Sequence, residues 1–322
     1  MDLLNPYTLQ VLTFLFLNLI LAISIYITLS TGQLSLGHAG FMSIGAYTTA
    51  IATKSADMPL AIALIVAVVL TGVIALIIGY PTLRLHGLYL AIATLGFGEV
   101  VRVIMLNLPI TNGALGLTGL KSIGTRLYDL EKIIGINAAD WGISVSQMKA
   151  LSTLLAMVVL VVVILLCQIR LERSRVGRAF SAIKADETAA RAMGINITYY
   201  KMLAYLIGSM MAGLGGGLYA HITTSITPDD FNYHRVVEIL SFAVIGGSEI
   251  IIGPLFGAAL LTGLPEFLRV LAEYKMIFYG ILLIAVMAFR PHGLITASTF
   301  TVWKQRKSRN QDEIKTSDKE AL

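Results

Sequence analysis

The chain has 322 residues, of which 56% are hydrophobic and 13% are charged, and its mean hydropathy is +0.79. A soluble domain carries about 25% charged residues because its surface faces water, so this composition excludes a soluble globular protein. The net charge is +5, but the basic residues gather in a few short segments, as membrane orientation signals do, and we expect no nucleic-acid partner. We predict an all-α, multi-pass protein of the cell (inner) membrane, surrounded by the lipid bilayer.

Apolar stretches long enough to cross the membrane recur along most of the chain, since a spanning helix takes about 20 residues. They lie at about 9–29, 36–53, 59–80, 87–106, 149–169, 198–220, 235–252, 255–271 and 275–290. The second begins with Gly37 and His38 and the seventh contains Glu238 and Glu249, so either could be a re-entrant or broken helix. We therefore expect a transmembrane helical bundle of about 8 to 10 spans.

Lysine and arginine gather at residues 170–201 and 304–319, and we expect both segments in the cytoplasm. The loop at about 107–147 is balanced in charge and is expected outside. Counting spans between these points places the N-terminus outside and the C-terminus in the cytoplasm. We expect residues 1–302 to form one transmembrane permease domain. Residues 303–322 are charged and lack apolar periodicity, which predicts a disordered cytoplasmic tail near anionic lipid.

Residues 172–196 form a long polar segment that carries an amphipathic helical pattern. Asp186 or Thr188 could cap a second short helix in it, and Gly194 could end that helix. Such a segment either lies on the lipid surface or docks into a groove of a cytoplasmic protein. Its many alanines favour protein contact, because a helix lying on lipid usually carries bulkier apolar residues.

Part of this segment resembles the coupling loop of ABC importer permeases, whose signature is Glu-Ala-Ala, three residues, then Gly. Residues 189–194 read Ala-Ala-Arg-Ala-Met-Gly, while Glu187 stands one place early and Thr188 occupies the glutamate position. Longer stretches resemble LivM-type permeases of the LivH/LivM family, in that family's order from about residue 30 to 292. These stretches are 32–41, 44–47, 83–95, 98–99, 173–179, 245–247 and 253–258. The chain departs from the family at 248–252, where small residues are usual and Glu249 stands instead.

The resemblance implies a permease subunit of an ABC importer that forms the translocation pathway for branched-chain amino acids, and not an enzyme. Its implied partners are a second homologous permease subunit, two ATP-binding subunits and an extracytoplasmic substrate-binding protein. No cofactor is expected in this chain, because ATP would be bound by the partner subunits, and no G-x-x-x-x-G-K-[ST] motif occurs in it. The implied ATPase-coupling residues are Arg175, Gly177, Arg178, Asp186, Glu187, Ala189, Ala190, Met193 and Gly194.

Two alternatives remain open on the residues alone. The chain could be a permease of the same family for urea, amides or other amino acids. It could instead be a self-sufficient ion-coupled secondary transporter or channel that uses ionisable residues inside its spans. The sequence does not decide whether the two permease subunits of an importer would be identical.

Ionisable residues inside predicted spans are costly to insert and are therefore candidates for the transport pathway. Glu99 with Arg102, and Glu266 with Arg269, are each three residues apart and share a helix face, so a structural ion pair explains them as well. The candidates for the pathway or for structure are Gln33, His38, Glu99, Arg102, Glu249, Glu266 and Arg269.

Glycines are concentrated late in the chain. Gly208 with Ala212, and Gly213 with Gly217, each put two small residues on one helix face, which predicts close helix packing. The pairs at 246–247 and 253–254 bracket an expected helix break. The five histidines are scattered without metal-ligand spacing, and we expect neither a metal site nor a catalytic site.

Overall fold

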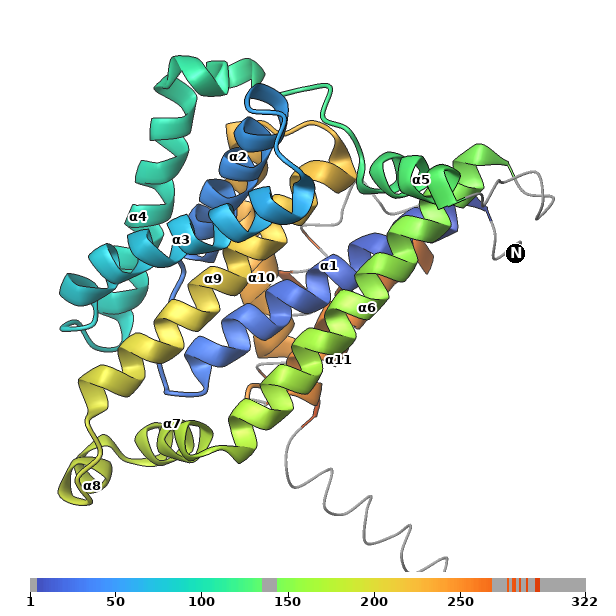
Figure 1. The fold of residues 1–322 in the computed structure, drawn as a ribbon. Coiled ribbons are helices and arrows are strands. Elements are labelled where there is room, and N and C mark those ends of the chain that lie inside the picture. Colours follow the sequence, from blue (N-terminus) through green and yellow to red (C-terminus); the bar gives the residue numbers. More distant parts are fainter. Residues whose placement is uncertain are drawn as a thin grey trace, which may run out of the picture.

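A computed structural model describes residues 5–134, 144–267 and 293–295, together with the single residues 277, 280, 281, 284 and 288. The described part of the chain is a bundle of α-helices with short 3-10 turns and no strand longer than one bridge (Figure 1). Five of its helices are long and apolar enough to cross a membrane. The prediction of an all-α transmembrane bundle is confirmed.

Three helices form the centre of the bundle, and the two later ones cross at glycines. Gly45 lies against the backbone of Gly213, and Gly216 lies against the backbone of Met42, so a Cβ at Gly45 or Gly216 would collide with main-chain atoms. Glycine at these crossings lets the two backbones approach closely. The central helices are α1 (Pro6–Leu29), α2 (His38–Ser55) and α9 (Ile197–Thr223).

The stretch at 36–53, which is weakly apolar for a span, is helix α2. Most of its side chains are buried, because α9, α3, α4 and α10 pack around it. A helix enclosed by protein does not need an apolar surface toward lipid, which explains its modest hydropathy.

Three further helices lie outside this centre and carry large apolar side chains on their outer faces. Ile65 is 63% exposed and Val159 is 62% exposed, a pattern that suits contact with lipid. α6 lies against α1, and α3 lies against α9 (Figure 1). The outer helices are α3 (Leu60–Thr82), α4 (Leu88–Asn107) and α6 (Val145–Arg173).

The loop at 107–147 contains a helix that the charge count did not predict. Helix α5 (Ile123–Ile134) packs across the first part of α6. The packing is close at Gly124, where a Cβ would meet the carbonyl oxygen of Lys149. α5 is amphipathic, with Ile123 buried and Lys132 exposed, and it lies at the end of the bundle where α1 begins (Figure 1).

The seventh predicted span ends earlier than expected. Helix α10 (Tyr233–Gly246) stops where Gly247 adopts φ 101°, and α11 (Ile252–Phe267) begins after a short break. The predicted boundary at residue 252 is therefore wrong, while the predicted break between 246 and 253 is confirmed. A glycine is required at Gly247 because other residues are strained at this φ.

A segment near the C-terminus closes the end of α10. The N–H groups of Leu294 and Ile295 donate to the carbonyl oxygens of Ile245 and Gly246 at 2.9 and 3.0 Å. These bonds satisfy carbonyl groups that the last turn of a helix leaves free. Most of the predicted span at 275–290, and all of the predicted tail at 303–322, lie outside the described residues.

Candidate functional site

The chain leaves α6 through a sharp turn into two short helices, α7 (Arg175–Ala185) and α8 (Glu187–Ala192), at one end of the bundle (Figure 1). Ser174 Oγ accepts hydrogen bonds from two N–H groups in the first turn of α7, at 3.1 and 3.3 Å. Gly177 lies so close to the carbonyl oxygen of Glu172 that a Cβ there would collide with it. A capping serine and a glycine therefore set the direction of α7.

One face of α7 is anchored in the membrane bundle. Phe180 is 3% exposed and packs in a cluster with Ile23 and Ile27 of α1 and Ala204 of α9. Its outer face is basic: Arg178 is exposed, and its Nη1 donates to a backbone carbonyl at the end of α6, 2.9 Å away. Movement of α7 would therefore act directly on the two central helices that hold Phe180.

The ends of α8 are those predicted from the sequence. Asp186 Oδ1 accepts hydrogen bonds from the N–H groups of Thr188 and Ala189 at 2.7 and 3.0 Å, which is a helix N-cap. Gly194 follows the helix at φ 81°. A Cβ at Gly194 would meet nothing within 4 Å, so the positive φ alone explains the glycine.

The alanines of this segment do not all share one face. Ala190 is 4% exposed and packs with Ile183 of α7 and Ile197 of α9, so it supports α8 from inside. Ala189 is exposed, and Met193 is 83% exposed. Ala190 therefore does not belong to the surface that α8 presents, while Ala189 and Met193 do.

Two lysine contacts tie the segment to the bundle. Glu187 forms an ion pair with Lys201 in the second turn of α9. Lys184 Nζ donates to the carbonyl oxygen of Ser248 at 2.6 Å, which joins α7 to the break between α10 and α11. Partial burial lowers the pKa of Lys184, and the nearby Glu249 carboxylate opposes this shift.

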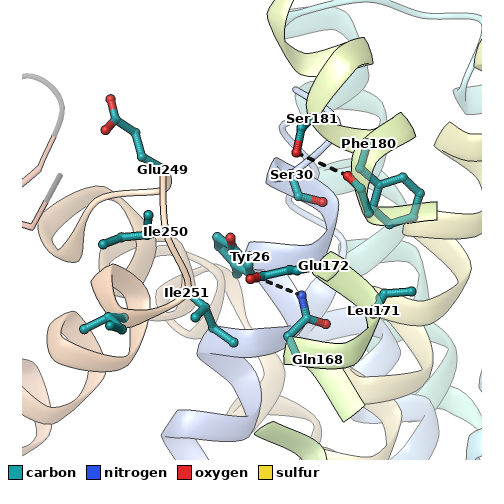
Figure 2. A pocket seen from close by; sticks show the side chains of 12 residues that line it. Tyr26, Ser30, Gln168, Leu171, Glu172, Phe180, Ser181, Glu249, Ile250 and Ile251 are labelled. Atoms are coloured by element: carbon teal, nitrogen blue, oxygen red, sulfur yellow. Dashed lines mark hydrogen bonds between the residues drawn. The ribbon is translucent and has the colours of Figure 1, made fainter. Parts of the chain in front are cut away.

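A cavity of about 260 Å³ lies beside this tie. Figure 2 shows Tyr26 of α1 and Glu172 of α6 between its walls, with Ser181 of α7 on one side and Glu249 on the other. Glu249, which the sequence placed inside a span, is therefore an exposed residue of the interhelical break. The cavity lies between α7 and the α10–α11 break, which the Lys184 contact joins.

The candidates Gln33 and His38 lie inside the protein, between α1 and α2. Gln33 is 3% exposed and His38 is 2% exposed, and His38 Nδ1 lies 3.2 Å from the carbonyl oxygen of Ser35. The N–H of Leu36 donates to Thr94 Oγ1 of α4 at 2.9 Å. Most of the non-helical stretch before α2 is thus covered by protein.

Glu99 and Arg102 form the ion pair that their spacing suggested. Arg102 Nε and Nη2 donate to Glu99 Oε1 at 2.9 and 2.6 Å. Arg102 Nη1 also donates to Asp229 Oδ1 at 2.9 Å, in the 3-10 turn Pro228–Phe231. The carboxylate side chains are 52% and 78% exposed, so this is a surface bridge between α4 and that turn.

Arg235 and Glu238 form another ion pair with a spacing of three residues, and this pair was not among the candidates from the sequence. Arg235 Nη1 donates to Glu238 Oε2 at 2.8 Å, and these side chains are only 14% and 12% exposed. The Arg235 guanidinium also lies 5.4 Å from the centre of the Tyr219 ring. The three-residue spacing that marked Glu99 could have found this pair.

Two sequence candidates, Glu266 and Arg269, remain predictions. The side chains of Glu266 and Arg269 lie outside the described residues. Within the described ranges, no three histidine, cysteine or acidic side chains gather as a metal site would require.

A bundle of apolar spanning helices with a polar helix pair at one end is the architecture of a multi-pass membrane protein. A family described as "Branched-chain amino acid transport system / permease component" matches residues 7–287, and the chain belongs to this family.

Curated relatives carry corresponding names. The chain is 33% identical over 293 residues to the Salmonella typhimurium "High-affinity branched-chain amino acid transport system permease protein LivM", covering 88% of this chain and 68% of the relative. The LivH protein of the same organism is 30% identical over 175 residues, covering 52% and 54%. The Yersinia enterocolitica "Autoinducer 2 import system permease protein LsrC" is 25% identical over 204 residues, covering 60% and 56%. No solved structure matches the chain.

Proposed function

We propose that the chain is the membrane-spanning subunit of an ABC importer for branched-chain amino acids. It pairs with a second permease subunit and takes its energy from two ATP-binding subunits. A binding protein delivers the amino acid to the opposite side. Relatives named for branched-chain amino acid transport support this substrate. LivM and LivH are separate permease proteins, and this supports a second permease partner.

The observation that carries the coupling role is the construction of the α7–α8 segment. Its inner side is fixed to α1 and α9 through Phe180 and Ala190, while Ala189 and Met193 are exposed at the tip. A segment that lay on lipid would bury its apolar residues in the bilayer. This segment buries them in its own bundle and leaves a small, smooth outer surface, which suits a protein groove.

Orientation follows from the same proposal. The ATP-binding subunits are cytoplasmic, so the end of the bundle with α7 and α8 faces the cytoplasm. The basic residues at 170–201 lie at this end, in agreement with the positive-inside rule. The start of α1 and helix α5 then face outward. Residues 1–302 act as one permease domain in this arrangement.

The test is reconstitution of uptake with and without the partner subunits. We expect Met193→Arg to abolish uptake and its stimulation of ATP hydrolysis, because a charged side chain enters the docking groove. Met58→Arg is the matched control, since Met58 is also exposed but lies at the opposite end of the bundle. If the complex assembles with Met193→Arg and its uptake is unchanged, the proposed role of the α7–α8 segment in coupling is refuted. Uptake by the chain alone under an ion gradient would favour a secondary transporter instead.

Substrate needs its own experiment, because one relative is named for the import of autoinducer 2 rather than an amino acid. The reconstituted importer with its own binding protein should accumulate leucine, isoleucine or valine. Competition by urea or short amides, without uptake of any branched-chain amino acid, would assign the chain to another substrate of the same family.

A further inference from the structure

A groove of about 590 Å³ opens on the side of the bundle where α5 meets α3 and α6. Its floor is apolar and closed: Ile123, Met157 and Leu218 are 5%, 1% and 4% exposed. Its walls include Leu64 of α3 and Leu160 of α6, which pack on the same cluster. Water is not favoured in so apolar a space, because it would find no hydrogen-bond partners on the floor.

The groove lies beside the first turns of α3, between two spanning helices. Its two side walls belong to α3 and α6, both of which are long and apolar enough to span a membrane. Leu64 stands four residues inside α3, which is about 6 Å along the helix axis. The amphipathic helix α5 completes the lining with Ile123, Leu127 and Leu130, and its apolar face and charged face suit the interface between lipid and water.

Charged groups occur only at the rim of this groove. Lys121, Arg126 and Asp129 line it, which leaves one net positive charge. The Arg126 Nε is buried and has no hydrogen-bond partner. A buried guanidinium N–H without an acceptor is costly, and phosphate oxygens are favoured acceptors for arginine.

We propose that the groove binds one phospholipid of the leaflet on the α5 side. An acyl chain lies on the apolar floor between α3 and α6, and the phosphate is held by Arg126 and Lys121. A phospholipid joins in one molecule the two chemistries that the lining requires, an apolar chain and an anionic head. This inference depends on the chain being embedded in a membrane and not on what the importer carries.

The occupant is tested by photocrosslinking in the complete importer, purified from membranes in detergent. Ala156 lines the groove and is replaced by a diazirine analogue of leucine; the matched control places the same group at Val159, which is 62% exposed on α6 and lies outside the groove. The importer is washed extensively in detergent before irradiation, and we expect a phospholipid adduct at position 156 and none at position 159. A protein adduct at position 156, equal lipid adducts at both positions, or no adduct at position 156 would each overturn the proposal.

The head-group contact has a separate test. The importer is reconstituted in phosphatidylethanolamine with a minor share of phosphatidylglycerol, and bound lipid is counted by mass spectrometry after purification. We expect Arg126→Gln to lower the preference for phosphatidylglycerol about fivefold, the effect of one basic residue near an anionic head. Lys132→Gln, on the exposed side of α5 and outside the groove, should leave the preference unchanged. An unchanged preference in Arg126→Gln, with uptake and assembly intact, would overturn the assignment.

Discussion

Phe180→Ala should detach α7 from the membrane bundle without unfolding the bundle. Phe180 is 3% exposed and fills a cluster with Ile23, Ile27 and Ala204, so its removal leaves a cavity between α7, α1 and α9. Truncating a buried phenylalanine costs about 3–5 kcal/mol. The cost falls on the docking of α7, since the spanning helices keep their other contacts.

Amide hydrogen exchange measures the free energy that the docking of α7 loses in this variant. A free-energy change of about 3 kcal/mol corresponds to roughly a hundredfold larger open population, because about 1.4 kcal/mol is a factor of ten. Amide exchange in α7 should therefore accelerate about a hundredfold or more in a lipid-embedded complex, if α7 opens locally. The amides of α9 should exchange at the wild-type rate.

Function should change in the same variant. On the proposed coupling route, ATP hydrolysis should continue while uptake falls, because motion of the ATP-binding subunits no longer reaches α1 and α9. Phe256→Ala is the matched control, since Phe256 is 42% exposed on α11 and should leave both readouts unchanged. Normal exchange in α7 of Phe180→Ala would refute the anchoring argument, and normal uptake with accelerated exchange would refute the coupling route.

Two other predictions concern stability. Gly216→Ala should destabilise the bundle by about 1–3 kcal/mol, because its Cβ meets the Met42 backbone; Gly96→Ala has open space, should cost nothing, and serves as the control in thermal unfolding. The lowered pKa of docked Lys184 means that it releases its proton before the unfolded chain does, so stability should rise with pH between that pKa and 10.5. Lys184→Met should lack this rise in unfolding measurements, and equal pH dependence in the two proteins would contradict the lowered pKa of Lys184.

Local chemistry made the helix ends of this protein readable. Asp186 and Gly194 bound α8 as expected, because a capping carboxylate and a positive φ depend on a few neighbouring residues. The break between α10 and α11 was readable for the same reason, since Gly246 and Gly247 stand side by side. The error at the end of the seventh span came from hydropathy, which continues through residues 250–252 although the helix does not.

Contacts between distant residues were not readable. Asp229 joins Arg102 from 127 positions away, and no local pattern links the two. Likewise, helical spacing put Ala189 and Ala190 in one segment, but only the positions of Ile183 and Ile197 show that Ala190 faces inward. Helix α5 was not predicted because only the charge balance of its loop was considered. Its apolar face is recognised from its packing against α6.

Hydropathy and helix periodicity are properties of single stretches of chain, so they were enough to predict the membrane class, the helical fold and the polar segment at 172–196. The sequence also carried the family resemblance that the comparison with known families confirmed. Only the packed helices show which side of that segment is exposed, what Lys184 and Arg102 contact, and where α3, α5 and α6 leave a groove. These features require several helices to be placed against one another, and residue spacing along one helix does not contain that information.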